Sequence, residues 1–428
     1  MPPSPRNAIV TYRSFGGAFD RPEAGAHTQR TPFESGTDPR EESALRAQLS
    51  SALSILEEES LRQGPGMMAA VPNQFASLLQ SRMLEEPPPG DLQALSAGTG
   101  EMRALEVKYD EHDILGWVGS VFTWWRKISP EPWRTPSDAP DPIGNGKKLR
   151  VAMMADWGTG LYGAPVCARS IERDPKPVDL LLHLGDVYYS GTQGEVRSRF
   201  LDLWPKRTGA ISRACNANHE MYTGGEGYFR VLLPAFEQKA SYFALQNDHW
   251  VLVGLDSAYT DHDLAGDQAA WLEKIVEKAG DRKVVVFSHH QPYSLFDSQG
   301  PKLVEKLGGL LGRRRLFAWY WGHEHRCVIF DRHPVWGLHG RCIGHGGYPY
   351  FRDQLGGFQL AEGKVWRKVP AKNLIPGALV LDAPNRYVEG EEERYGANGY
   401  VTLEFDEDHM TENLHDPDGS VLLARQLS

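Results

Sequence analysis

Short apolar runs alternate with amphipathic segments along most of the chain after Lys148. Apolar runs that stop at Gly, Asp, Asn or His predict buried strands, and apolar residues at a helical spacing predict the helices between them. The alternation of strand and helix predicts βαβ units with parallel strands. We expect strands to end near Ala155, Leu184, Cys215, Ser288 and Trp321, with helices over Pro165–Arg173, Gln193–Trp204, Asp267–Lys278 and Pro301–Leu311.

Antiparallel strands are expected to complete the sheets. The runs Ser241–Gln246 and His249–Asp256 flank a turn at Asn247–Asp248, which predicts a hairpin. The tail, Asn398–Gln426, resembles a further hairpin that adds strands at a sheet edge. Together these patterns predict an α/β fold in the sense of an α+β sandwich: two packed mixed β-sheets flanked by helices, with an N-terminal helical extension.

The part of the chain before the alternating pattern is organised differently. Its first stretch is rich in Pro, Gly, Ser and charge without periodicity, which indicates a loose arm. The next stretch carries leucines at a helical spacing, and a third holds five prolines, a composition typical of a linker. We therefore predict a loose arm over 1–41, a helical accessory region over 42–129, a linker over 130–147 and the main domain over 148–428.

An aromatic segment, Ile114–Lys127, ends the helical accessory region. Its tryptophans include Trp117, Trp124 and Trp125. Such a stripe most often packs against a neighbouring part of the protein, and a surface for a membrane or an aromatic ligand is the alternative. The pattern leaves the partner of the N-terminal helices open.

Composition narrows the class of protein. The 428 residues carry a net charge of −10, which argues against a general nucleic-acid-binding surface. Four cysteines without CxxC pairs are typical of reduced, mostly buried thiols in the cytosol. The N-terminus has no apolar segment of signal-peptide length, and no window has the apolar length of a membrane span. We therefore expect a cytoplasmic protein.

Polar side chains follow the ends of successive predicted strands. The carboxyl ends of strands are where open α/β sheets place their sites. The side chains offer hard oxygen and imidazole nitrogen without thiolate, a set that suits Mn, Fe, Zn or Co. They are too many for one ion and fit two ions that share a carboxylate, an arrangement that clamps a phosphoryl group and makes a hydroxide nucleophile from bound water. The candidates are Asp156, Asp186, Asn218, His289, His323 and His325.

Five motifs occur here in the order of a known family. The segments DWG, GDVYY, NHE, SHH and GHEH resemble the motifs of the calcineurin-like metallophosphoesterases, and the tyrosine-containing form is most similar to the purple acid phosphatase branch. The resemblance covers roughly Leu149–Gly347 and makes 148–428 the predicted metallophosphoesterase domain. Each motif alone is common by chance, so the order of all five carries the interpretation.

The resemblance implies a role for each matching residue. Asp156, Asp186, Tyr189 and His325 would hold the first metal ion. The second would be held by the bridging Asp186 together with Asn218, His289 and His323. His219 would stand beside the phosphate and protonate the leaving oxygen or stabilise the transition state. The implied cofactor is two metal ions per chain, Fe, Mn or Zn, and Fe³⁺ with a divalent ion if Tyr189 is a ligand.

Some assignments stay open at this point. Tyr189 is the predicted tyrosine ligand, with Tyr188 as the ligand or packing of Tyr189 in the core as alternatives. His289 is the predicted histidine ligand and His290 the alternative, and whichever is not the ligand is expected beside the ligands. Ala217 stands where the family pattern has glycine, which puts the loop geometry in question. Three further residues are candidates for substrate contact or support of the ligands, with structural roles as the alternative: Glu220, Asp256 and His345.

The predicted function is that of a phosphoric ester hydrolase with a dinuclear metal centre. The sequence leaves open whether it is a monoesterase or a diesterase. An acidic chain favours small phosphorylated substrates over nucleic acid. Two alternatives remain: a catalytically weak binding or regulatory module with this fold, and a nuclease-type phosphodiesterase. The natural substrate, the metal in the cell, the oligomeric state and the role of residues 1–147 are not determined by the sequence.

Overall fold

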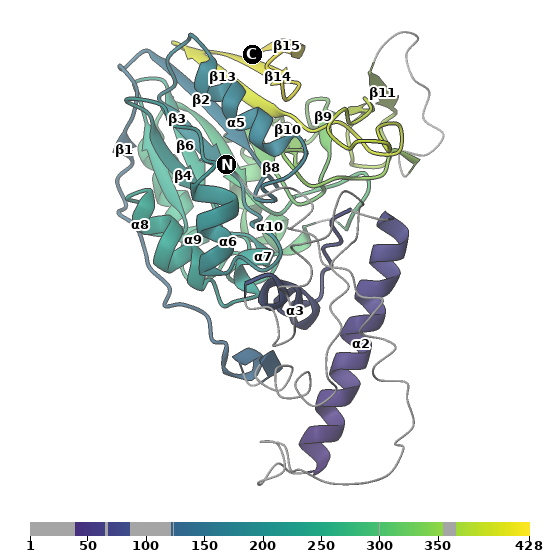
Figure 1. Ribbon diagram of the computed structural model, residues 1–428. Helices are drawn as coiled ribbons and strands as arrows, with labels where there is room; N and C mark the ends of the chain where they lie inside the picture. Colours follow the sequence, from purple (N-terminus) through teal and green to yellow (C-terminus); the bar gives the residue numbers. More distant parts are fainter. Residues whose placement is uncertain (1–38, 65–66, 86–120, 123, 299, 354–364) are drawn as a thin grey trace, which may run out of the picture. The chain divides into compact units, whose positions relative to one another are not determined.

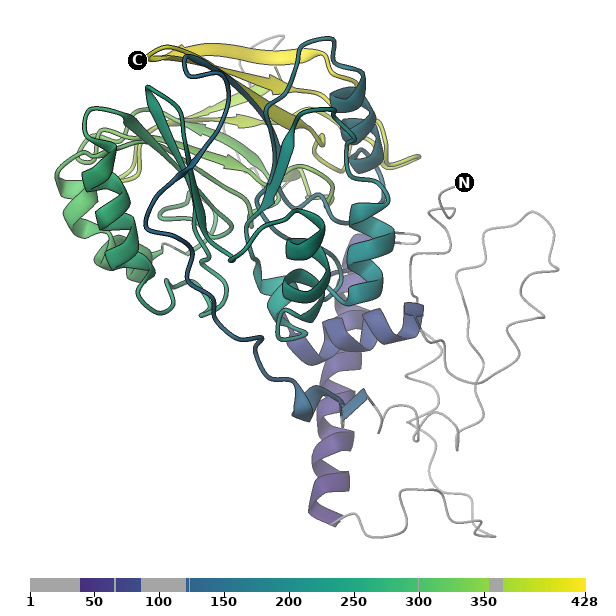
Figure 2. The ribbon, with the colours of Figure 1, turned by 90° about the vertical axis from the view of Figure 1, so that its left-hand side faces the viewer.

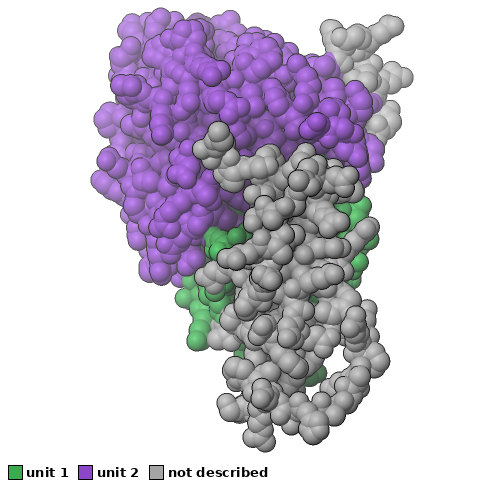
Figure 3. Space-filling view, viewed as in Figure 1, with its two compact units in different colours: residues 1–129, 188–190, 222–224 green, residues 130–187, 191–221, 225–428 purple. Residues whose placement is uncertain are grey.

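The computed structural model of the chain describes residues 39–64, 67–85, 121–122, 124–298, 300–353 and 365–428 (Figure 1). The chain divides into two compact units, coloured separately in Figure 3. Unit 1 comprises residues 1–129, 188–190 and 222–224, and unit 2 comprises the rest. Each unit is described by itself. Among the described residues, no helix combines the length and the apolar character needed to cross a membrane.

Unit 2 contains two mixed β-sheets. In the six-stranded sheet the order is β15 (Val421–Leu427), β14 (His409–His415), β13 (Tyr400–Asp406), β2 (Lys148–Met154), β3 (Leu180–His183) and β4 (Ile211–Ala214). Strands β2, β3 and β4 are parallel, and β13 pairs antiparallel with β2. The tail therefore adds strands at an edge, as predicted.

The nine-stranded sheet has a parallel centre. Strands β6, β7, β8 and β10 run parallel, and β5 pairs antiparallel with β6, which confirms the predicted hairpin. The order is β1 (Asp141–Pro142), β5 (Phe243–Gln246), β6 (Trp250–Gly254), β7 (Lys283–Ser288), β8 (Leu316–Trp321), β10 (His339–Ile343), β9 (Cys327–Phe330), β12 (Ala378–Leu381) and β11 (Trp366–Val369).

The two sheets pack face to face, with helices on their outer faces (Figure 2). Apolar side chains from both sheets, such as Val151 and Val285, share one buried cluster. This arrangement confirms the predicted fold class. The helices are α5 (Ala164–Arg173), α6 (Gln193–Glu195), the π-helical η3 (Val196–Leu201), α7 (Asn218–Met221), η4 (Tyr228–Leu232, also π-helical), α8 (Leu233–Ala235), α9 (Gln268–Ala279), α10 (Pro301–Lys306) and α11 (Gly308–Gly312).

A buried ion pair joins the two sheets. Arg341 on β10 donates from Nε to Glu412 Oε2 on β14 at 2.8 Å and from its terminal nitrogen to Oε1 at 2.8 Å. Tyr320 donates its hydroxyl to the same carboxylate at 2.9 Å. Arg341 is 1% exposed and Glu412 is fully buried. Each charge is therefore compensated by a partner and by hydrogen bonds, as burial requires.

The proline-rich segment 130–147, predicted as a linker, lies within unit 2. Trp133 stacks on Tyr242 at a centroid distance of 5.1 Å, and the backbone carbonyl of Glu131 accepts a hydrogen bond from the Tyr259 hydroxyl. The segment contains β1, which pairs with β5. Prolines suit such an extended strap because they need no backbone donor. All four cysteines are free, buried thiols.

In unit 1, α2 (Pro39–Gln63) and α3 (Gln74–Glu85) pack through their predicted apolar stripes, with Leu56 and Leu79 among the buried residues. The hydroxyl groups of Ser81 and Ser190 lie 2.6 Å apart, and Gln74 donates to the carbonyl of Tyr222 at 2.8 Å. Trp124 and Trp125 are half-buried at the edge of this apolar cluster. Trp117 lies outside the described residues.

Candidate metal centre

Three parallel strands of the six-stranded sheet deliver oxygen donors to one edge. Asp156 follows β2, Asp186 follows β3 and Asn218 follows β4. Because parallel strands end at the same edge, the loops after them bring these side chains together. The two carboxylates are buried.

The parallel strands of the nine-stranded sheet deliver imidazoles. His289 follows β7 directly, and His323 and His325 follow β8. The backbone N–H of His323 donates to both carboxylate oxygens of Asp156, at 3.0 and 3.1 Å. A backbone N–H from the nine-stranded sheet therefore helps to hold Asp156, a candidate ligand from the six-stranded sheet, in position.

The loops that carry these residues use the left-handed region of backbone space. The φ angles are 53° at Asp156, 80° at Asp186, 69° at His323 and 54° at His325. Non-glycine residues rarely adopt such angles, and they concentrate at functional sites where the surrounding structure enforces them. The strain is evidence that these positions are held for their side chains.

Glycines next to these residues allow the close approach of the two sheets. A side chain at Gly185, whose φ is +100°, would place its Cβ 2.5 Å from the Cβ of Ala217 and 2.8 Å from Nδ1 of His289. A Cβ at Gly322 would lie 2.5 Å from Oδ2 of Asp156. The glycine at 185 leaves the room that the methyl group of Ala217 needs, so the departure from the family pattern is accommodated.

One group of donors converges on the Nε2 atom of His289. That nitrogen lies 2.9 Å from Oδ1 of Asn218, 3.3 Å from Nδ1 of His323 and 3.4 Å from Oδ1 of Asp186. The opposite nitrogen, Nδ1, faces the carbonyl of Leu184 at 2.9 Å. Such a contact orients the ring and leaves Nε2 to act as a ligand.

A second group shares Asp186 with the first. Ligand atoms of Asp156, Asp186 and His325 all lie within 4.8 Å of one another. Nε2 of His325 is 3.5 Å from Oδ1 of Asp156 and 4.0 Å from Oδ2 of Asp186. The two oxygens of Asp186 thus face different groups, which is the geometry of a bridging carboxylate.

Burial shifts the pKa values of the candidate ligands at this edge of the sheets. Burial, with the charge of Asp186 added, raises the pKa of Asp156 well above its usual range. Burial lowers the pKa of His289 to about 4 and also lowers the pKa values of His323 and His325. Neutral imidazoles bind metal ions, and adjacent carboxylates ionise together most easily beside a cation.

The donor set fits two metal ions. Carboxylate and amide oxygens meet neutral imidazole nitrogens, and the shared Asp186 links the two groups. Hard oxygen with borderline nitrogen suits Fe, Mn, Zn or Co. The ligand assignments implied by the family motifs stay predictions, which these distances support. Tyr189 is buried and belongs to unit 1, so its role as a ligand stays a prediction.

The remaining candidates differ in their surroundings. His219 is buried in α7 and interacts electrostatically with Asp186. Glu220 accepts a hydrogen bond from the backbone N–H of Asp186 at 3.2 Å, and so supports the bridging residue. Asp256 accepts from Asn216 and from two backbone N–H groups of its own turn, which is a structural role. His345 is buried, with Nδ1 3.2 Å from the carbonyl of Ile343.

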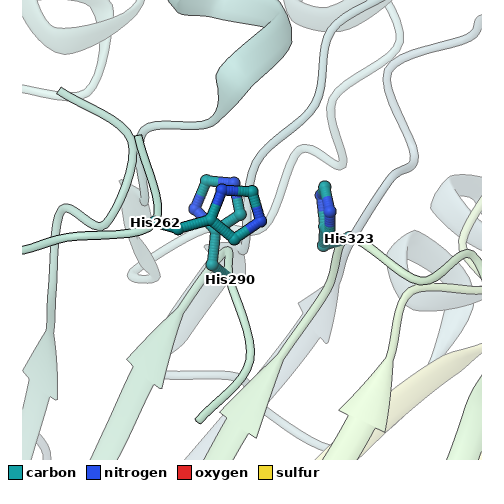
Figure 4. Close-up of side chains that lie close together, drawn as sticks. All are labelled: His262, His290 and His323. Carbon is teal, nitrogen blue, oxygen red and sulfur yellow. The ribbon is translucent and has the colours of Figure 1, made fainter. Parts of the chain in front are cut away.

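A further histidine was missed by the sequence interpretation. His262 packs on His290 with ring centroids 3.8 Å apart, and His323 lies beside both (Figure 4). His290 thus lies next to the first donor group rather than at its centre. The available signal for His262 was its position between Asp261 and Asp263, shortly after β6.

The comparisons with known proteins agree with this geometry. Residues 149–327 match the model of the calcineurin-like phosphoesterase family, a range that includes every candidate metal ligand. The probable glycerophosphodiester phosphodiesterase GpdQ of Arcobacter nitrofigilis is 28% identical over 162 residues, which are 36% of this chain and 58% of that protein. The chain thus spans less than two thirds of that relative. Residues 149–327 are therefore similar to a calcineurin-like phosphoesterase domain.

Solved structures with a similar fold include a plant enzyme and a parasite protein. The purple acid phosphatase PPD1 of yellow lupin, Lupinus luteus, aligns with a TM-score of 0.48 at 15% identity, over 68% of this chain and 55% of that chain. GAP50, described as the anchor in the inner membrane complex of Plasmodium, aligns with a TM-score of 0.47 at 13% identity, over 66% and 89%.

Proposed function

We propose that this chain is a metal-dependent phosphoester hydrolase with a dinuclear metal centre. The observation that supports it most strongly is the convergence of two donor groups on Asp186, with donors from both sheets. Asp156 and His325 would hold one ion with Asp186. Asn218, His289 and His323 would hold the other. Two such cations, about 3.5–4 Å apart, neutralise the charge of a phosphoryl group and lower the pKa of bound water.

The chain itself supplies the remaining functions. His219 follows Asn218 directly and is buried beside the donor groups. In its protonated form, its imidazole would donate a proton to the leaving oxygen or a hydrogen bond to the developing charge. Glu220 would keep the Asp186 loop in place through the backbone N–H it accepts.

The metal identity follows from the donor set only in part. Fe, Mn and Zn all accept carboxylate, amide and imidazole ligands. A phenolate from Tyr189 would favour Fe³⁺ beside a divalent ion. Visible absorption of the purified iron-loaded protein would report this ligand, and its loss in Tyr189→Phe would identify the residue.

The proposed substrate class is small phosphorylated molecules. A net charge of −10 disfavours long polyanions. The relative from Arcobacter nitrofigilis is a probable phosphodiesterase, so both ester types have to be tested.

The test is hydrolysis of p-nitrophenyl phosphate and bis-p-nitrophenyl phosphate by metal-reconstituted protein. Asp186→Asn is compared with Asp408→Asn, a matched change at an exposed aspartate. We expect turnover that Asp186→Asn abolishes and Asp408→Asn preserves, and the preferred ester then separates monoesterase from diesterase. Equal turnover in both variants would refute the proposal. Metal-loaded protein that is inert towards every phosphoester would instead favour a binding module.

A further inference from the structure

A cluster of three imidazoles lies beside the candidate dinuclear centre. His262, His290 and His323 each offer a ring nitrogen, and these three atoms all lie within 4.8 Å of one another (Figure 4). His262 comes from the loop after β6, His290 from the end of β7 and His323 from the end of β8. Three adjacent parallel strands therefore deliver one histidine each to the same place.

His290 is oriented towards this place by its other contacts. Its Nδ1 lies 3.0 Å from the hydroxyl of Ser257, and the same hydroxyl accepts the backbone N–H of His290 at 3.0 Å. Its Nε2 is buried and has no hydrogen-bond partner among the described residues. A buried nitrogen without a partner costs free energy, so binding of a cation at this nitrogen would be favourable.

His262 has the arrangement typical of a metal-binding histidine. Its Nδ1 lies 2.9 Å from a carboxylate oxygen of Asp261, which fixes the ring and leaves the opposite nitrogen as a donor. The residue also adopts a φ of 54°, in the left-handed region. It thus shares the backbone strain of the candidate ligands described above.

The two nitrogens of His323 have different neighbours. Its Nδ1 is 3.3 Å from Nε2 of His289, and its Nε2 is 3.6 Å from Oδ2 of Asp297. A second carboxylate, that of Asp261, lies 3.7 Å from Nε2 of His290. Three imidazoles with two carboxylates at the edge form a donor set suited to a divalent cation.

We propose that His262, His290 and His323 form an accessory cation site for Zn²⁺ or a similar divalent ion, next to the dinuclear centre. His323 would be shared, with one nitrogen for each site. An imidazole that binds cations through both nitrogens has lost its ring proton, a loss that two flanking positive charges favour. Three histidines leave a fourth coordination position open, as in zinc sites that bind water or a substrate oxygen.

The test measures the amount of zinc bound per chain and does not depend on enzymatic activity. Metal-free full-length protein is titrated with Zn²⁺ alone, desalted and analysed for zinc per chain. We expect His262→Asn to retain one equivalent less than the wild type. Asparagine tolerates the left-handed backbone, and the side chain of His262 is 32% exposed, so the variant is expected to fold. His409→Asn, at a 63% exposed histidine, is the matched control and should retain the wild-type amount.

Asp261→Asn provides a second measurement. It keeps the three imidazoles but weakens the contact that orients His262, so we expect about 10–100-fold weaker binding of that last equivalent. Equal zinc content in wild type and His262→Asn would overturn the accessory site while leaving the dinuclear centre intact. Conversely, a zinc difference in protein that hydrolyses no phosphoester would support the accessory site and remove the proposed activity.

Discussion

The two sheets of unit 2 make different contributions to one site. The six-stranded sheet supplies the oxygen donors, Asp156, Asp186 and Asn218. The nine-stranded sheet supplies imidazoles, including His289 and His325. Among the candidate ligands of the dinuclear centre, the carboxylates therefore come from one sheet and the imidazoles from the other.

The two sheets therefore affect the site in different ways: one supplies its charge, and the other supplies neutral ligands. Burial, followed by the charge of Asp186, raises the pKa of Asp156, so a nearby cation would favour the ionised form of this carboxyl group. Burial keeps the imidazole of His289 neutral, so the nine-stranded sheet adds ligands without adding charge. A change on the first sheet should alter the charge balance of the site, and a change on the second should alter mainly the number of ligands.

The largest effect is expected for Asp186→Asn. The change removes the carboxylate that both donor groups share. Loss of even an outer partner of a ligand typically costs about 10–100-fold, so loss of this ligand should reduce kcat/KM by more than ~100-fold and lower the metal content. Turnover and metal analysis check this. Normal metal content with normal turnover would show that the residue is not shared.

His219→Ala should separate chemistry from metal binding. The proposed role of the imidazole is to act on the leaving group and not to bind metal, so we expect a loss of about 10²–10⁴-fold in kcat with unchanged metal content. A substrate with a much better leaving group should recover part of the rate. A variant that loses metal would show instead that His219 supports the ligands.

His289→Ala compared with His290→Ala tests the contribution of the nine-stranded sheet. His289 lies at the centre of the first donor group, while His290 belongs to the accessory cluster, where it packs on His262. We expect His289→Ala to lower kcat/KM more than His290→Ala, and the two variants to lose different metal ions in a Zn²⁺ titration. The reverse order of activities would exchange the two assignments.

The buried ion pair between the two sheets can be removed by a substitution that leaves the candidate metal ligands unchanged. Glu412→Gln leaves the buried guanidinium of Arg341 without a counter-charge. Breaking one partner of a buried ion pair typically costs about 3–5 kcal/mol, and we expect that loss in the free energy of unfolding. Urea denaturation checks it, with Glu407→Gln, in the exposed ion pair with Lys147, as a control expected to cost less than about 1 kcal/mol.

Local patterns in the sequence determined much of this architecture. Apolar runs predicted the ends of β7 and β8 at Ser288 and Trp321, where the structure has them, because a buried strand needs continuous apolar side chains. The donors follow those runs directly, so their type and order could be read along the chain. The bridging role of Asp186, implied by the family motifs, stays a prediction; its two carboxylate oxygens lie near His289 and His325.

The tertiary structure differs from the sequence prediction in one helix and in several contacts between distant segments. The predicted helix Pro301–Leu311 is split at Leu307, ahead of two glycines that favour helix poorly. Trp133 turns a predicted linker into a strap because its ring packs on Tyr242, over a hundred residues away. His262 could not be recognised since its partners come from other strands.

The pairing of Arg341 with Glu412 shows why such contacts cannot be predicted from the sequence. Charged residues read along a sequence predict an exposed surface, since an isolated buried charge is costly. Only the packing of one sheet on the other brings these two charges together and makes their burial tolerable. The sequence determined which strands form and which donors end them, and the packing of the sheets decided which donors meet.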